Sequence, residues 1–165
     1  MKLQAGDVLF IKSGTVIGKL VTWGTEFRYT HVAVALDSEH VMDIRAFKKS
    51  SVVHIDELKI IDYVINRPKD KLNLQTLKNV FVDCYYKPYD YKAVFKLLLK
   101  IKFKMKIPRA SSYDTKSLYC SEFIDYLFCE MNIDLVEGCD TLVSIEDLYH
   151  SDRLEEVEYG NKLSN

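Results

Sequence analysis

The stretch 28-RYTHVAVALDSEHVMDIRA-46 predicts two neighbouring strands joined by a short polar turn at residues 37–39. An imidazole opens the first strand at His31, and a carboxylate interrupts the second strand at Asp43. Charged side chains are uncommon inside strands unless they are exposed or paired. The hairpin therefore raises the question of whether these two polar residues belong to a catalytic site.

The pattern of apolar residues extends this hairpin into a sheet and then into a helical half. Strands are predicted at residues 6–13, 31–37, 40–46, 50–56 and 62–68, with a last edge strand at 154–160. The four strands between residues 31 and 68 are expected to form an antiparallel meander. Helices are predicted at 70–86, 89–103 and 119–132, with a short helix or turn at 144–152 and a short helix or irregular loop at 14–26. A sheet beside a helical half indicates an α+β fold.

The composition is that of a globular protein. The chain has 165 residues, of which 48% are hydrophobic, and its net charge is −1. One domain over residues 1–165 is expected, without the basic excess that nucleic-acid binding requires. The N-terminal residues lack the layout of a signal peptide, and no apolar run approaches the roughly 18 residues of a membrane span. These features favour a cytoplasmic location.

The cysteines provide the candidate nucleophile. They are Cys84, Cys120, Cys129 and Cys139. Their spacing contains neither a CxxC pair nor a zinc-like pattern, so we expect free thiols in a reducing compartment, with no metal and no organic cofactor. Cys120 lies at the start of the third predicted helix, where unpaired backbone N–H groups favour a thiolate and stabilise an oxyanion. The alternative is a buried core cysteine, which is common in proteins.

His31 and Asp43 each have a structural alternative. A histidine at a strand edge is often a surface or capping residue, and Asp43 with Arg45 is equally consistent with a solvent-facing side of the strand. A turn centred near Ser38 and Glu39 would place Asp43 opposite Val34, about three residues from His31. Contact between the two side chains then requires an offset or a twist of the hairpin.

The segments of the chain, taken in order, resemble the circularly permuted NlpC/P60-type papain-like superfamily, and in particular its YiiX/YaeF-like amidase group. The segments that carry the resemblance, from residue 5 to residue 157, are AGDVLFIKSG, YTHVAVALD, HVMDIRA, SSVVHIDEL, KPYDYKAVF, YCSEFIDYLF and LVSIEDLYHSDRLEEV. The histidine precedes the cysteine, which is the reverse of papain and the mark of the permutation. The chain departs from the family pattern in having Asp43 where Glu is commoner and in lacking a proline in SIEDL.

The resemblance implies a cysteine hydrolase, an amidase or peptidase, that acts through an acyl-enzyme. Cys120 would be the nucleophile, His31 the general base and Asp43 the group that orients the imidazole. Family members cleave peptidoglycan peptides or act on lipid and acyl substrates, so a peptide, amide or acyl substrate and a bacterial or phage origin are implied. An acyltransferase of the same fold and a catalytically inactive binding module stay open as alternatives.

Two further features bear on the substrate. Tyr119 and Trp23 are the preferred candidates to line a substrate cleft near Cys120. The segment Lys92–Arg109 is basic and contains no acidic residue, and residues 100–107 alternate strictly between lysine and apolar residues. The alternation predicts a strand or extended edge from Lys100 to Ile107. The segment is either a solvated basic face over core residues or a contact for an anionic membrane or an acidic substrate.

Overall fold

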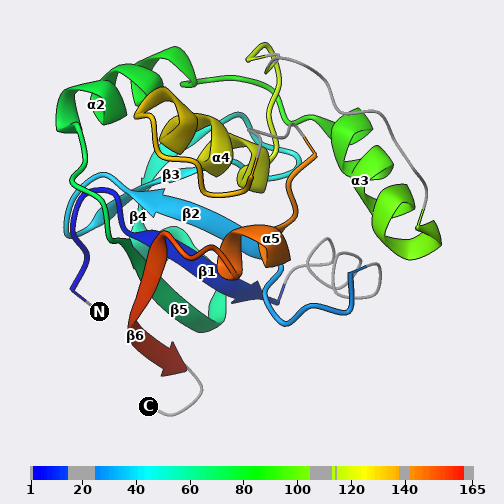
Figure 1. Cartoon of the computed structure of the whole chain (residues 1–165), viewed down its shortest axis with the longest axis horizontal. Coiled ribbons are helices and arrows are strands. Elements are labelled where there is room, and N and C mark those ends of the chain that lie inside the picture. Colours follow the sequence, from blue (N-terminus) through cyan, green and yellow to red (C-terminus); the bar gives the residue numbers. More distant parts are fainter. Residues whose placement is uncertain (1, 15–24, 105–112, 114, 138–141, 162–165) are drawn as a thin grey trace.

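A computed structural model describes residues 2–14, 25–104, 113, 115–137 and 142–161 (Figure 1). Its strands are β1 (Val8–Ser13), β2 (His31–Ala35), β3 (His40–Asp43), β4 (Ser51–His54), β5 (Ile60–Pro68) and β6 (Leu154–Asn161). Its helices are the 3₁₀ helix η1 (Ile55–Glu57) and the α-helices α2 (Leu74–Asp83), α3 (Tyr91–Phe103), α4 (Cys120–Glu130) and α5 (Ile145–Tyr149). These elements confirm the predicted α+β class. The predicted helix or loop at 14–26 lies mostly outside the described residues.

The sheet has the strand order β4-β3-β2-β1-β5-β6, and every neighbouring pair is antiparallel. The predicted meander is correct from β2 to β4 but wrong for β5, which pairs with β1 rather than with β4. The reason is burial, because β5 is almost continuously buried whereas β4 is half exposed. A strand whose side chains are buried on both faces is typical of the interior of a sheet, where it has a hydrogen-bonded strand on each side. A half-exposed strand is typical of the edge of a sheet. The last predicted strand is confirmed as the edge strand β6.

Apolar residues fill both faces of the sheet. On one face, Phe10, Val32 and Met42 pack against Phe81 of α2 and Phe123 of α4. Figure 1 shows α2 and α4 together above the strands on this side. On the other face a smaller cluster is formed by Leu9, Ile11, Ala33, Val41, Ile65 and their neighbours. The β2–β3 hairpin is thus enclosed from both sides, which fixes the position of its polar ends.

The lysine-rich segment is helical through Phe103, which agrees with the predicted helix at 89–103. The strand predicted from Lys100 by the alternating pattern is therefore wrong over its first four residues. Leu97 is buried against Tyr119 and Leu142, and Ile101, one helical turn later, packs against the same cluster. This helical spacing outweighs the alternating pattern. Lys104 ends the helix in a left-handed conformation, and residues 105–107 lie outside the described part of the chain.

The described cysteines differ in their bonding. Cys84 and Cys120 are free thiols, as predicted, whereas Cys129 is disulfide-bonded. The prediction of free thiols is therefore wrong for Cys129, because spacing along the sequence does not reveal which sulfur atoms the fold brings together. No helix among the described residues is long and apolar enough to cross a membrane.

A buried ion pair holds the turn that begins β1. Both carboxylate oxygens of Asp7 accept hydrogen bonds from Arg67 of β5, at 2.7 and 2.8 Å, and one also accepts the Gln4 N–H at 2.8 Å. Asp7 is buried, and Gly6 before it has φ = 90°, a conformation that favours glycine. The carboxylate thus connects the turn to the strand that pairs with β1.

We expect the Asp7→Ala variant to lose about 2–4 kcal/mol of unfolding free energy, because it leaves the partly buried Arg67 guanidinium without its counter-charge. Urea unfolding followed by circular dichroism measures the change. Asp56→Ala, at a side chain that is 78% exposed, is the matched control and should change stability by less than about 0.5 kcal/mol. Equal midpoints for the two variants would contradict this role of Asp7.

Candidate active site

Three polar residues lie at the ends of three elements. His31 is the first residue of β2, Asp43 the last residue of β3, and Cys120 the first residue of α4. Because β2 and β3 are antiparallel, the start of one and the end of the other meet at the same edge of the hairpin. The α4 helix packs over β2 with its first turn above this edge (Figure 1).

The observed register differs by one residue from the predicted one. Val34 pairs with Met42, not with Asp43, because the Leu36 N–H donates to the His40 carbonyl and centres the turn on Ser38. The two side chains nevertheless meet, with His31 Nε2 lying 2.7 Å from Oδ1 of Asp43. Asp43 is only 2% exposed, so the interpretation of a solvent-facing aspartate is wrong.

The imidazole of His31 contacts both other polar residues. Since Nε2 is engaged by Asp43, Nδ1 is the nitrogen left to form the hydrogen bond between His31 and Cys120. Burial alone would lower the pKa of His31, but the hydrogen bonds to Asp43 and Cys120 outweigh it and raise that pKa from 6.5 to about 10. The site therefore favours an imidazolium, which is the form that pairs with a thiolate.

Asp43 also has a partner for its second oxygen. The guanidinium of Arg45 forms an ion pair with Oδ2, and Arg45 is itself mostly buried. A carboxylate that accepts contacts on both oxygens has a fixed orientation. Arg45 thus helps to hold Asp43 in the plane that meets His31.

The start of α4 presents Cys120 with unpaired backbone donors. Tyr119 is the N-cap and has an extended conformation, so Cys120 and Ser121 occupy the first helical positions, whose N–H groups have no partner within the helix. The Ser121 hydroxyl donates to the Val143 carbonyl at 2.9 Å, and the Tyr119 hydroxyl donates to the same carbonyl at 3.2 Å. These bonds fix the helix start against the segment before α5.

A cavity of about 370 Å³ lies beside these residues. Cys120, His31 and Tyr119 line it, and its walls are otherwise mostly apolar, including Phe27, Tyr29, Ile44, Val94, Leu97 and Leu98. Tyr119 is thus among the lining residues, with its hydroxyl engaged by the Val143 carbonyl, and its role in substrate binding stays a prediction. Trp23, the other predicted cleft residue, lies outside the described residues.

Tyr89, for which no role was predicted, also lines this cavity. A bridge between residues 89 and 118 holds it beside the start of α4, with Asp90 N–H donating to the Leu118 carbonyl at 3.1 Å. Burial raises the pKa of Tyr89, and the nearby charge of Cys120 raises it further. The phenol of Tyr89 thus keeps its proton. A signal was present in the KPYDY motif, but spacing alone does not identify which tyrosine faces the cysteine.

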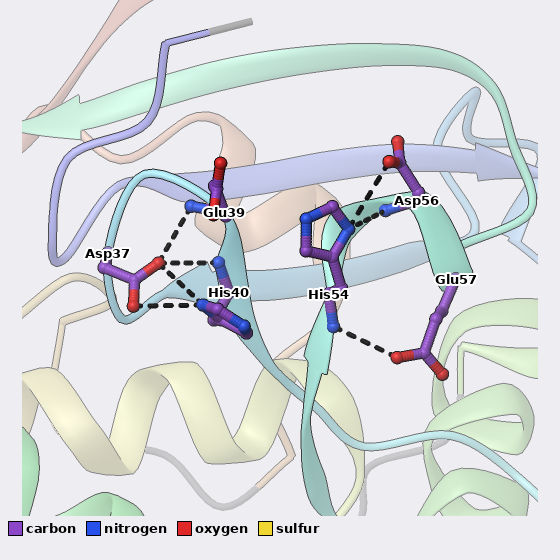
Figure 2. Close-up of polar contacts among 6 residues, drawn as sticks. All are labelled: Asp37, Glu39, His40, His54, Asp56 and Glu57. Atoms are coloured by element: carbon purple, nitrogen blue, oxygen red, sulfur yellow. Dashed lines mark hydrogen bonds and ion pairs between the residues drawn. The ribbon is translucent and has the colours of Figure 1, made fainter.

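A second group of histidines lies at the opposite end of β3 and at the end of β4 (Figure 2). His40 and His54 face each other across the two strands, and their ring centroids are 5.6 Å apart. His40 Nδ1 lies 3.0 Å from Asp37, while His54 Nδ1 accepts the Asp56 N–H at 3.3 Å at the start of η1. These contacts belong to a turn and a helix cap. Among the described residues, no group of three or more His, Cys, Asp or Glu side chains could hold a metal ion.

Comparisons with known proteins show a likeness in fold. No family model matches the chain, and no curated protein does. Among solved structures, the chain is similar to one described as the crystal structure of the metalloprotein YiiX from Escherichia coli O157:H7, of the family DUF1105. The match has a TM-score of 0.71 at 15% identity and covers 97% of this chain and 99% of that one. The described residues of this chain offer no cluster that fits a metal centre, so no step is assigned to a metal. What the comparison establishes is that this chain has the fold of the YiiX structure over nearly its whole length.

Proposed function

We propose that this chain is a cysteine-dependent hydrolase of the permuted papain-like, NlpC/P60 type, with Cys120 as nucleophile. The observation that carries the proposal is the continuous contact from Asp43 through His31 to Cys120 at the mouth of a cavity. A nucleophile, a base within hydrogen-bonding reach and a carboxylate that orients the base make up the arrangement used in acyl transfer. The fold shared with YiiX is consistent with this assignment.

The chemical steps follow from the positions of these groups. His31 takes the Cys120 proton, and the thiolate attacks the carbonyl carbon of the substrate to form a tetrahedral oxyanion. The backbone N–H of Cys120 donates to that oxygen, and we assign the second donor to Tyr89 because it lines the same cavity. His31 then returns the proton to the leaving amine, alcohol or thiol, which departs and leaves a thioester on Cys120. Water, deprotonated by His31, cleaves the thioester and releases the acid.

The cavity supports an acyl substrate over a peptidoglycan peptide. Its walls carry leucine, isoleucine, valine and aromatic side chains, whereas a peptide rich in carboxylates and amines needs charged partners. The charged side chains that line the cavity within the described residues are His31, Arg45, Lys59 and Glu146. His31 and Arg45 are already engaged by Asp43, which leaves Lys59 and Glu146 for a charged substrate. We therefore assign the cavity to the apolar acyl part of an amide, ester or thioester.

Alkylation tests the role of the triad. At pH 6.5, iodoacetamide should modify Cys120 about 10- to 100-fold faster than an ordinary thiol, because an ordinary thiol is only about 1% thiolate at that pH. His31→Ala should lower the alkylation rate of Cys120 to that of an ordinary thiol, and Asp43→Asn should lower it in part. Mass spectrometry of labelled peptides measures these rates. A small exposed thiol such as glutathione is the reference for an ordinary thiol, whereas Cys84 should stay unlabelled because burial raises its pKa to about 12. Equal rates at Cys120 in the wild type and in His31→Ala would contradict the proposal.

Chain-length dependence tests the acyl assignment. With p-nitrophenyl esters, kcat/KM should rise about fourfold per methylene from acetate to octanoate, since each buried methylene contributes about 0.8 kcal/mol. Leu98→Trp, which fills the cavity, should lower kcat/KM for the octanoate ester to the value for the acetate ester. It should leave kcat/KM for the acetate ester unchanged. Val82→Trp, at an exposed position on α2, is the matched control. A flat profile in the wild type would exclude the acyl assignment while leaving the alkylation result intact.

A further inference from the structure

The outer face of α3 is apolar although it faces solvent. Tyr91, Phe95 and Phe103 are 48%, 63% and 68% exposed. Together with Leu99 they recur every fourth residue, so they form one ridge along the helix. The opposite face carries Leu97 and Ile101, which pack on the body of the protein. A helix with apolar residues on both faces is expected to be covered on both faces.

Basic residues flank this ridge. Lys92 and Lys96 are exposed and follow the ridge residues by one position, which places them along one side of it. Lys102 lies on the other side and contacts Glu26 at 3.0 Å, and Lys104 is exposed at the end of the helix. The helix itself contains no acidic residue. The exposed surface of α3 thus combines aromatic rings with positive charge.

A neighbouring exposed aromatic residue extends the surface. Phe47 is 81% exposed, and its ring centroid lies 5.9 Å from that of Tyr91. The Phe47 N–H donates to the Tyr91 hydroxyl at 2.7 Å, which holds the loop after β3 against the helix. Phe47 also lines the cavity beside Cys120, as do Val94 and Leu98 of α3. The apolar outer surface is therefore continuous with one wall of the cavity.

We propose that the outer face of α3, together with Phe47, docks on an anionic lipid bilayer. Aromatic and apolar side chains that insert at the depth of the headgroups, with lysines alongside that contact lipid phosphates, are the features of an interfacial helix. Figure 1 shows α3 at one side of the molecule, apart from the helices α2 and α4 that cover the sheet. Docking in this orientation brings the wall of the cavity to the membrane surface, where acyl chains are concentrated.

Vesicle co-sedimentation tests the docking, with the full chain and vesicles of phosphatidylcholine containing 30% phosphatidylglycerol. The wild type should bind these vesicles, and binding should fall steeply with salt and on pure phosphatidylcholine. Lys92→Glu/Lys96→Glu should weaken binding at least about fivefold per lysine, the equivalent of roughly 1 kcal/mol each. Phe95→Ser/Phe103→Ser should weaken it further, because it removes the inserted rings.

Controls separate this proposal from the catalytic one. Cys120→Ala should bind vesicles like the wild type, so loss of activity and loss of docking are independent results. The double variant Val82→Ser/Lys78→Glu on α2 removes one exposed apolar side chain and one exposed lysine, the same residue types that are changed on α3. It should leave vesicle binding unchanged. If the α3 variants bound the vesicles as tightly as the wild type, or if the wild type did not bind them, the proposal would be overturned. Sedimentation equilibrium that shows a dimer dissociated by Phe95→Ser would also overturn it, because a second copy would then cover this face.

Discussion

The hydrogen bond between His31 and Asp43, at 2.7 Å and almost out of contact with water, is the constraint on which the candidate site depends. It fixes the imidazole, leaves the other ring nitrogen to Cys120, and favours the positive charge that a thiolate needs. Desolvation by itself opposes that charge. The negative charge of the Asp43 carboxylate, buried beside the imidazole, compensates for this loss of solvation. The ion pair between Arg45 and the second oxygen holds the carboxylate in place.

The sheet provides the rigidity that this contact requires. β1 lies between β2 and β5, and the buried pair of Asp7 and Arg67 joins the start of β1 to β5. The hairpin of β2 and β3 is thereby fixed along one side and covered by α4, whose first residue supplies the sulfur. The proposed activity and the proposed membrane contact use different parts of this frame, the edge of the hairpin and the outer face of α3.

Much of this arrangement could be predicted from the sequence, and what could not has identifiable physical causes. Alternating and helical patterns predicted the strands and helices, including Cys120 at a helix start. The pairing of β5 with β1 was missed, because local patterns do not encode which strands meet. From Lys100 to Phe103 the helical pattern and the lysine alternation predicted different structures, and the packing of Ile101 on the body of the protein favours the helix. The bond at Cys129 and the position of Tyr89 depend on contacts between distant segments, which spacing does not contain.

The most direct test of the central claim is the titration of His31 by NMR, with the imidazole nitrogens labelled with ¹⁵N. We predict that His31 remains an imidazolium at pH 8 and loses its proton only near pH 10, in line with its raised pKa of about 10. In the Asp43→Asn variant, whose amide carries no charge, the same ring should lose its proton at a lower pH. Deprotonation of wild-type His31 near its ordinary pKa of 6.5, unchanged by Asp43→Asn, would contradict the account.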